Sequence, residues 1–339
     1  MKEMIAFDIG LGTQDILKPE VDGGFNKFVL PSPIKLLKKR VEAIKGDLFI
    51  DGYTMGGGPL SKSIVDHAER NSVYMTERSA RTISDDLDKV EDKGIILKES
   101  KDSEVSKDKN CRDIRSLSLG DLYSLPDVKE LLSSIEVDFP SRVGVAVQDH
   151  GVSPKGVSDR KFRFDYFKEA IESNRGFSDL IFEEKTGRFS RIDSVIEFLK
   201  ENGYDPLVMD SKLASVLGCI EEDKRVIVDS GNGHFMAASV DGEEIVGLFE
   251  HHTRMLSRDK IKMYLNKLID GELTNEEVFE DGGHGAYVKD SLDPSEIVVT
   301  GPNRNLVPRE IGYRTARPLG DVMMTGAFGL CRASEVIPT

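Results

Sequence analysis

The chain has 339 residues, a formal net charge of −14 at pH 7, 39% hydrophobic residues and 31% charged residues. This length fits about two domains, and the composition is typical of a soluble globular protein. The acidic balance argues against nucleic acid or an anionic membrane as the main partner. We therefore expect a small-molecule substrate, with no nucleic-acid or membrane partner.

The sequence holds no apolar run long enough to span a membrane. It enters a strand directly, without the apolar region of a signal peptide. Its three cysteines, Cys111, Cys219 and Cys331, are far apart, which predicts a reduced chain in the cytoplasm. Their spacing also excludes the usual iron–sulfur and thiolate–zinc motifs.

The first predicted element is a buried strand over residues 4–9, where apolar residues surround a single acid, Asp8. The glycines that follow allow a tight turn whose N–H groups approach an anion. A carboxylate beside that anion requires a cation. The pattern favours a phosphate-binding hairpin with magnesium at Asp8, and a plain glycine turn is the alternative. The candidate phosphate contacts are Gly10, Gly12, Thr13 and Gln14.

The next residues alternate between strands and helices, which indicates a mixed sheet flanked by helices. Strands are predicted at 27–30 and 47–51, and helices at 34–44 and 60–70. A charged insertion is predicted near residues 71–135, and within it the polar segment 98–110 is predicted to be mobile.

A buried strand is predicted at 143–147, and Asp149 and His150 lie in the loop that follows it. Helices are predicted near 164–173 and 192–202, followed by a short strand at 206–209. Asp210 is then expected to cap a helix over residues 212–220, because its carboxylate can accept the first free backbone N–H groups.

A second copy of the first motif begins at residue 226. An apolar strand ends in Asp229, and return strands are predicted at 235–240 and 244–249. Later helices are predicted at 258–269, after Thr274 and at 321–333, and a strand at 297–300. The second loop repeats the order of acid, glycine, glycine and polar residue with Asp229, Gly231, Gly233 and His234.

Two such hairpins, one in each half, resemble the phosphate loops of the actin-like ATPase superfamily, which includes sugar kinases, actins and DnaK-type chaperones. Residues 212–220 and 323–329 resemble its two connecting helices, and residues 297–304 resemble its adenosine segment. This last segment has Gly301-Pro302 where the superfamily usually has paired glycines.

The resemblance implies an α/β fold of two actin-like (ribonuclease H-like) domains with a nucleotide cleft between them. Domain I would cover residues 1–210, including the insertion, and domain II residues 211–339, with the final helix packing back across the cleft. Asp8 and Asp229 would hold Mg²⁺, and Gly301 would contact the nucleotide.

Within the superfamily the chain is most similar to a group of uncharacterised archaeal-type proteins that carry the label of pyruvate formate-lyase activating enzyme. That activity would imply radical iron–sulfur chemistry, which the cysteine spacing contradicts.

A kinase of this class needs a carboxylate base near the acceptor hydroxyl. The resemblance places Asp210 close to both phosphate loops, and Asp149 ends a strand in the first half. Both are candidate catalytic residues, and a plain N-cap is the alternative for Asp210.

Histidines in glycine-rich or strand-end loops form a second group of candidates. They could contact phosphate or substrate, bind a transition metal, or be ordinary polar loop residues. The candidates for metal binding are His150, His251, His252 and His284.

The sequence therefore predicts an ATP- and Mg²⁺-dependent phosphotransferase or ATPase that acts on a small substrate. Two alternatives remain open: a histidine-metal acyl- or carbamoyl-transferase on the same scaffold, and a non-enzymatic nucleotide-dependent assembly or sensor protein. The sequence leaves open the substrate, the nucleotide and the oligomeric state.

Overall fold

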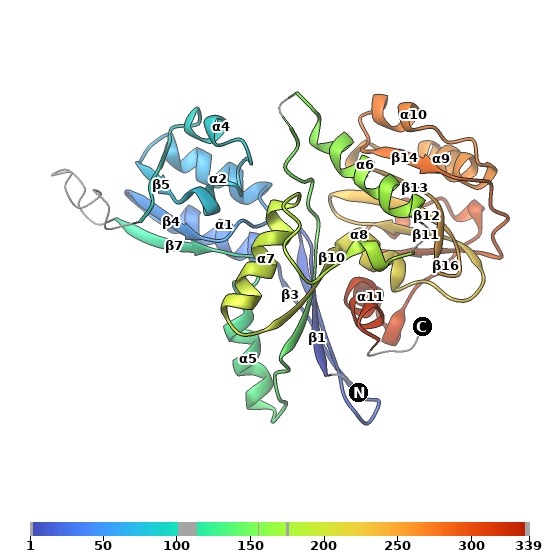
Figure 1. Ribbon diagram of the computed structural model, residues 1–339, viewed down its shortest axis with the longest axis horizontal. Helices are drawn as coiled ribbons and strands as arrows, with labels where there is room; N and C mark the ends of the chain where they lie inside the picture. The colour runs from blue at the N-terminus through green and yellow to red at the C-terminus, as the bar shows by residue number, and fades with distance from the viewer. Residues whose placement is uncertain (1–2, 101–113, 155, 174–175, 336–339) are drawn as a thin grey trace.

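The computed structural model describes residues 3–100, 114–154, 156–173 and 176–335 of the chain (Figure 1). Its strands form three separate sheets, two with six strands and one with four, and helices cover them. The predicted α/β class is confirmed.

The first sheet is built around β1, whose apolar side chains are fully buried. β1 pairs antiparallel with β2 and parallel with β8, and β8 pairs parallel with β10. In sheet order the strands are β3 (Phe25–Pro31), β2 (Thr13–Pro19), β1 (Met4–Ile9), β8 (Arg142–Val147), β10 (Asp205–Asp210) and β9 (Ile181–Phe182).

The second sheet repeats this arrangement around β11. β11, β12 and β13 form an antiparallel meander, and β15 and β16 continue the sheet in parallel on the other side of β11. In sheet order the strands are β14 (Gly285–Val288), β13 (Glu244–His252), β12 (His234–Asp241), β11 (Lys224–Ser230), β15 (Glu296–Thr300) and β16 (Arg314–Thr315).

The two sheets thus share the order of five strands, in which a three-stranded meander is extended by two parallel strands beside its first strand, and each sheet adds one antiparallel edge strand, β9 or β14. This duplicated order is the actin-like architecture that the two sequence motifs predicted, and the fold is confirmed.

Two helices, α8 (Ser211–Leu217) and α11 (Thr325–Ala333), pack against each other between these sheets (Figure 1). Glycines permit their close approach. A Cβ on Gly329 would lie 1.9 Å from the Ala214 carbonyl oxygen, and a Cβ on Gly218 would lie 2.0 Å from that of Thr325. These two glycines therefore allow the two helix backbones to come together.

Gly329→Ala is expected to destabilise the protein by about 1–3 kcal/mol, because the added methyl group must push the helix backbones apart. Thermal and urea unfolding would measure the loss. Gly120→Ala is the matched control, since no atom lies within 4 Å of a Cβ at Gly120. Equal stability of the two variants would contradict this account of the helix contact.

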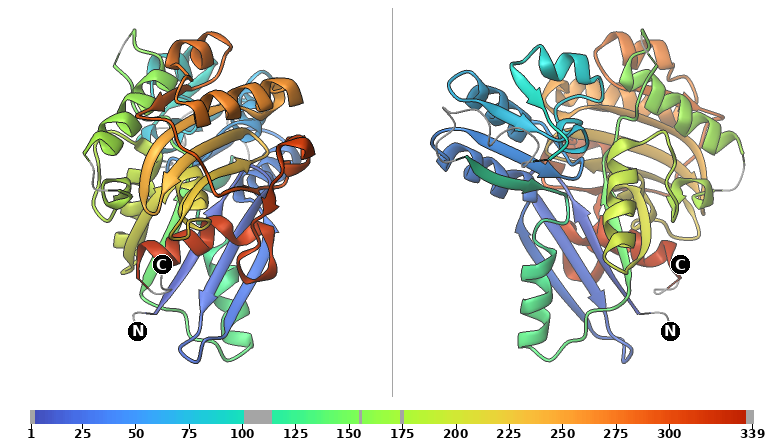
Figure 2. Two further views of the ribbon diagram at one scale, coloured as in Figure 1. Left: turned by 90° about the vertical axis from the view of Figure 1, so that its right-hand side faces the viewer. Right: turned by 60° about the vertical axis from the view of Figure 1, so that its left-hand side comes forward.

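Further helices cover the outer faces of both sheets (Figure 2). α5 (Leu125–Ser134) and α7 (Ser190–Glu201) bury their apolar faces against the first sheet. α9 (Arg258–Asp270) and α10 (Asn275–Glu280) do the same on the second. α10 follows Thr274 as predicted, and Thr274 and Glu277 form a capping box at its start. α6 (Asp159–Glu172) contacts β13 and β14, and so joins the two halves of the chain.

The third sheet forms a lobe of its own, on the left of Figure 1, with a separate apolar core. Its parallel strands are β6 (Ile95–Leu97), β5 (Val73–Met75), β4 (Leu48–Gly52) and β7 (Arg115–Leu119). Its helices are α1 (Pro33–Ala43), α2 (Pro59–Ala68), α3 (Glu77–Ala80) and α4 (Leu87–Glu91).

This lobe differs from the insertion predicted near 71–135. It already includes α1 and β4, whereas α5 packs on the first sheet. The sequence analysis did not predict strands β5 and β6, because each is only three residues long and lies between charged segments. The segment 98–110, predicted to be mobile, lies almost entirely outside the described residues.

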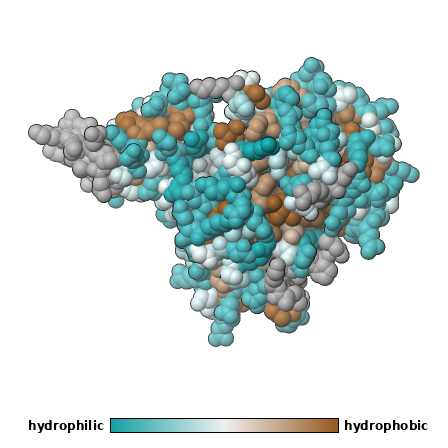
Figure 3. Space-filling view, in the orientation of Figure 1, coloured by the Kyte–Doolittle hydropathy of each residue, from teal (hydrophilic) through white to brown (hydrophobic). Residues whose placement is uncertain are grey.

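Short 3-10 helices occur in the connections, at Ser178–Leu180, Thr253–Met255, Arg304–Leu306, Arg309–Ile311, Pro318–Gly320 and Val322–Met324. The face of the molecule in Figure 3 is mostly hydrophilic, with hydrophobic residues gathered in small patches. Among the described helices, none is both long enough and apolar enough to cross a membrane.

Candidate functional site

A cavity of 1360 Å³ lies where the loops of all three sheets meet. The hairpin loop after β1 and the loop after β11 both line it, as do Gly301 after β15 and segments of the third lobe. The two motifs that the sequence places 221 positions apart (229 − 8) therefore open into one cavity.

The two loops have the same local geometry. Gly10 N–H donates to the Thr13 carbonyl oxygen at 2.9 Å, and Gly231 N–H donates to the His234 carbonyl oxygen at 3.0 Å. His234 thus occupies in the second loop the place that Thr13 occupies in the first.

The loops also meet at their tips. A Cβ on Gly12 would lie 2.7 Å from Asn232 Nδ2, so the absence of a side chain at Gly12 allows the Asn232 amide to approach the first loop. Asn303, which follows the adenosine-like strand β15, donates from Nδ2 to the Gly231 carbonyl oxygen at 2.9 Å. The three segments that the superfamily resemblance singled out are therefore in direct contact.

Asp8 ends β1 beside the start of both central helices. Ser211 Oγ donates to Asp8 Oδ1 at 2.7 Å, and a Cβ on Gly326 of α11 would lie 2.1 Å from Asp8 Oδ2. Burial raises the pKa of Asp8 to about 7, and the nearby Asp229 carboxylate adds to the rise. A carboxylate in this position gains from a cation that offsets its lost hydration.

Asp229 takes the equivalent place in the second half, where it forms an ion pair with Lys212 (Nζ–Oδ2, 2.9 Å). A Cβ on Gly301 would lie 2.7 Å from Asp229 Oδ1, and Gly301 has φ +90°, a conformation that favours glycine. Lys212 lines the cavity between the two acids and supplies a buried cation there.

Gln14 and Asp15 are adjacent on β2, and their side chains point to opposite faces of the sheet. Gln14 does not line the cavity. Instead, it is buried, donates to the Pro31 carbonyl oxygen at 3.0 Å and accepts from Ser124 Oγ at 2.8 Å. Asp15, which the sequence analysis did not select, lies opposite Asp8 in the β1–β2 pair and lines the cavity.

Burial and the Asp8 carboxylate raise the pKa of Asp15 to about 8. In the folded protein the Asp15 carboxyl therefore keeps its proton up to about pH 8. In the unfolded chain the same group loses its proton near pH 3.8, the ordinary pKa of the side chain. Between these values the free energy of unfolding should fall as the pH rises, by up to roughly 1.4 kcal/mol per pH unit.

Asp15→Asn is expected to flatten this pH dependence, because the amide does not titrate. Melting temperatures of the ligand-free protein at pH 5.5 and pH 8 would measure the effect. The wild-type chain should lose more stability over this range than the variant, and an equal loss in both would contradict the assignment to Asp15.

The two predicted catalytic carboxylates are engaged by buried donors. Asp210 caps α8 by accepting from Lys212 N at 2.9 Å, pairs with Arg163, and does not line the cavity. Asp149 lines the cavity but accepts from the backbone N–H groups of Gly151, Arg191 and Ile192 at 2.7–3.0 Å. Burial nevertheless raises the pKa of Asp149 to about 6.

A buried ion network supports one side of the cavity. Arg163 on α6 binds Asp210 (Nη1–Oδ2, 2.5 Å) and Glu250 on β13 (Nε–Oε2, 3.0 Å), and its guanidinium holds the pKa of Glu250 well below the ordinary range. Gln148 donates to Glu250 Oε1 at 2.6 Å. This network connects residues of the first sheet to the second.

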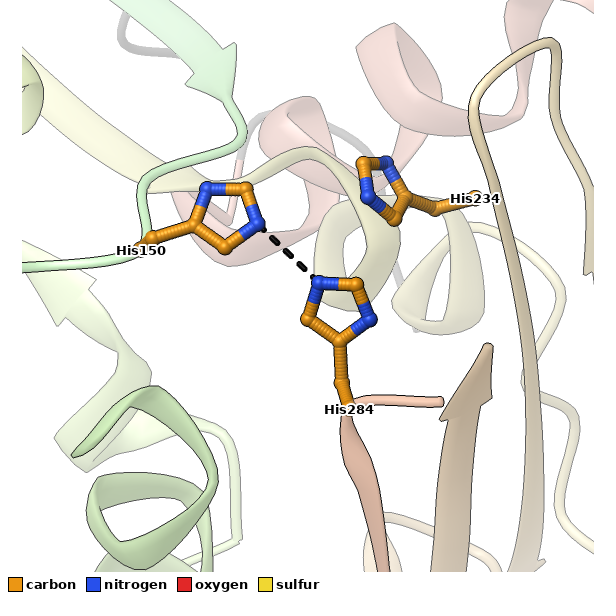
Figure 4. Close-up of side chains that lie close together, drawn as sticks. All are labelled: His150, His234 and His284. Carbon is orange, nitrogen blue, oxygen red and sulfur yellow. Dashed lines mark hydrogen bonds between the residues drawn. The ribbon is translucent and has the colours of Figure 1, made fainter. Parts of the chain in front are cut away.

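Four imidazole rings gather beside this network and line the cavity, and we call them the histidine cluster: His150, His234, His252 and His284. Neighbouring ring centroids lie 4.7–5.7 Å apart. Figure 4 shows the rings of three of them turned toward one another from separate segments of the chain.

The rings of the cluster are largely buried, and the loss of hydration disfavours imidazolium. Burial, with Arg163 nearby, lowers the pKa of His150 to about 4. Burial also lowers the pKa of His284 to about 3 and of His234 to about 2. The rings are therefore neutral near pH 7 and carry free lone pairs.

His251 does not join the cluster. Adjacent residues of a strand face opposite sides, so His252 faces the cavity while His251 lies against Tyr264 and Asp281 (Nε2–Oδ2, 3.3 Å). The sequence analysis named both histidines as metal candidates because the sequence did not show which face of β13 lies toward the cavity.

The residues that the sequence analysis did not select are Lys212, Ser211 and Asp15. Lys212 and Ser211 directly follow Asp210, at the start of the helix that resembles the first connecting helix of the superfamily. Their position at this helix start is the feature of the sequence that could have identified them. The cavity as a whole combines glycine loops, paired acids and a buried lysine, which suits phosphate and a divalent cation.

A family model described as "Putative pyruvate format-lyase activating enzyme (DUF1786)" matches residues 55–306. No curated protein matches the chain in sequence. The activity in the family's description would use an iron–sulfur cluster held by thiolates. The described cysteines do not suit one, because Cys219 and Cys331 lie in the apolar core and burial raises both pKa values to about 12.

Several solved structures resemble the chain distantly. A protein of actin-like ATPase fold and unknown function from Bacteroides thetaiotaomicron is 8% identical over 96% of this chain and 95% of its own, with a TM-score of 0.41. The activator of the 2-hydroxyisocaproyl-CoA dehydratase from Clostridium difficile, with bound ADPNP, is 9% identical over 99% and 98%, with a TM-score of 0.36. The ethanolamine utilization protein EutJ from Carboxydothermus hydrogenoformans is 10% identical over 97% and 89%, with a TM-score of 0.38.

Proposed function

The chain belongs to the family whose model matches residues 55–306, and we propose that it is an ATP- and Mg²⁺-dependent phosphotransferase or ATPase that acts on a small substrate. The observation that carries this proposal is the convergence of two equivalent acid–glycine loops on one cavity. A polyphosphate between them would meet backbone N–H groups from both halves of the protein.

Mg²⁺ fits between the loops because carboxylates and phosphate oxygens are the ligands it prefers. Asp8 and Asp229 would hold the ion and its waters from the two sides. Lys212 would neutralise phosphate charge, since its ammonium already lies beside Asp229. Catalysis would then come from positioning and charge neutralisation of the phosphates.

The nucleotide would extend from the phosphate loops toward Gly301 and Pro302, which line the same cavity. Asp149 would be the carboxylate that accepts a proton from a substrate hydroxyl, and its position in the cavity lining, where Asp210 is absent, supports this role. Its raised pKa brings it closer to neutral pH, where a general base is most effective.

A thermal-shift screen of nucleotides with and without Mg²⁺ tests the binding step. A nucleotide at about 100 times its dissociation constant should stabilise the fold by roughly 2.7 kcal/mol. Release of phosphate, with and without candidate small acceptors, then separates ATPase from phosphotransferase activity. A nucleotide-dependent change in particle size without turnover would favour the assembly or sensor alternative instead.

The histidine cluster favours a second candidate, a histidine-metal acyl- or carbamoyl-transferase on the same scaffold. Its rings line the same cavity as the phosphate loops, so an ATP-driven step and a metal-assisted step could share one substrate site. This candidate requires that the cluster bind a metal.

A further inference from the structure

Three histidines of the cluster come from three elements in both halves of the chain. His150 follows β8 of the first sheet, His234 begins β12, and His284 directly precedes β14 (Figure 4). Three imidazoles brought together in this way, beside a cavity, need a physical reason, because each carries polar nitrogen atoms out of water.

The distances between their nitrogen atoms suit a common ligand. His150 Nε2 and His284 Nε2 are 3.0 Å apart, and one candidate ligand atom from each of the three residues lies within 4.8 Å of the others. Tetrahedral ligands at the usual Zn–N length of about 2.0–2.1 Å lie about 3.3 Å apart. Small side-chain rotations therefore bring all three rings onto one ion.

Hydrogen bonding within the protein does not satisfy these rings. Two neutral imidazole nitrogens can share only one proton, and His234 Nε2 and His284 Nδ1 are buried without a hydrogen-bond partner among the described residues. His284 is 1% exposed. A buried polar nitrogen without a partner is costly, and a bound cation would engage the free lone pair of His234.

The geometry points to a divalent transition-metal site formed by His150, His234 and His284. It is separate from the Mg²⁺ site at Asp8 and Asp229, and it does not depend on nucleotide binding. Imidazole ligands without carboxylate or thiolate suit Zn²⁺, Fe²⁺, Ni²⁺ or Cu²⁺ rather than Mg²⁺ or Ca²⁺.

The surroundings of the site hold the backbone at one of its ligands and offset the charge of a cation. Glu250 on β13 is fully buried, and its carbonyl oxygen accepts from the backbone N–H of His284 at 2.8 Å. The buried ion network beside the site contains two carboxylates, those of Asp210 and Glu250, and one guanidinium, that of Arg163. The excess negative charge favours a divalent ion close by.

Three protein ligands leave a fourth position open, which is typical of a catalytic metal rather than a structural one. All three histidines line the cavity, and His234 follows the second phosphate loop directly. The open position would take water or a substrate oxygen from a carbonyl, carboxylate or hydroxyl group. The metal would act on it as a Lewis acid, next to the bound phosphates.

Metal titration of the untagged full chain, stripped with a chelator and free of nucleotide, tests this site. Co²⁺ is the probe, because its visible absorption reports coordination geometry, and Zn²⁺ should displace it. We expect about one equivalent to bind in a tetrahedral site. His150→Ala, His234→Ala and His284→Ala should each weaken binding by about a hundredfold or more.

Two variants serve as controls. His67→Ala removes a partly exposed histidine of the third lobe and should leave binding unchanged, while His252→Ala should weaken it by less than about tenfold. Circular dichroism of each variant would verify folding, and His150→Gln replaces any alanine variant that unfolds. Less than about a tenth of an equivalent on the wild-type chain, or equal loss in the His67 variant, would overturn the assignment. Either result leaves the nucleotide proposal standing, because that proposal uses different residues.

Discussion

Replacing Arg163 by methionine is expected to lower the free energy of unfolding by about 3–5 kcal/mol. Arg163 is 1% exposed, and its guanidinium binds Asp210 and Glu250, which are also buried. Without it, two carboxylates remain in an apolar environment with no cation between them. Urea unfolding and melting temperatures would measure the loss.

Two comparisons separate the buried charge from simple loss of packing. The triple variant Arg163→Met, Asp210→Asn, Glu250→Gln removes the carboxylate charges as well and should recover a substantial part of the stability. Arg314→Met is the matched surface control, since Arg314 and its partners Glu221 and Glu296 are largely exposed, and it should cost about 0–1 kcal/mol. Similar losses in the Arg163 and Arg314 variants would contradict the structural role of the network.

Asp8→Asn and Asp229→Asn are expected to weaken Mg²⁺-nucleotide binding or turnover by roughly a hundredfold or more, because each change removes one ligand charge from a metal–phosphate site. Titration of Mg-ATP would measure binding. Asp241→Asn, at an exposed acid beyond the cavity, is the control and should bind as the wild-type chain does.

The stabilities of the two variants should differ, because the acids have different partners. Within the described part of the chain, the Asp8 carboxylate accepts a hydrogen bond only from the neutral Ser211 hydroxyl, and its pKa is raised to about 7, so Asn should leave stability unchanged or slightly higher above that pH. Asp229 pairs with Lys212, so Asn there should lower stability by leaving the ammonium unpaired. Intact nucleotide binding in both variants would contradict their assigned role.

The sequence predicted the fold because its signal was local and repeated. Each phosphate loop combines an apolar strand, an acid and two glycines within a few residues, and the same turn forms in both. The close packing of α8 against α11 depends on two glycines, Gly218 and Gly329.

Predictions that depended on contacts distant in the sequence were less complete. The sequence marks Asp210 as a candidate catalytic base but does not show its contact with Arg163, which lies 47 residues earlier. Gln14 is next to the first loop in sequence, but strand alternation turns it toward Ser124. The histidine cluster forms only when residues at β8, β12, β13 and β14 come together, so no spacing within one element could identify all of its members.

Equilibrium dialysis of the purified chain with radiolabelled ATP, in the presence of Mg²⁺ and again with a chelator, tests most directly whether the cavity between the two loops is a nucleotide site. We predict about one ATP bound per chain, with affinity that falls when Mg²⁺ is removed and falls again in Asp8→Asn. A wild-type chain that binds no ATP at millimolar concentration, or binds it equally with and without Mg²⁺, would contradict the account.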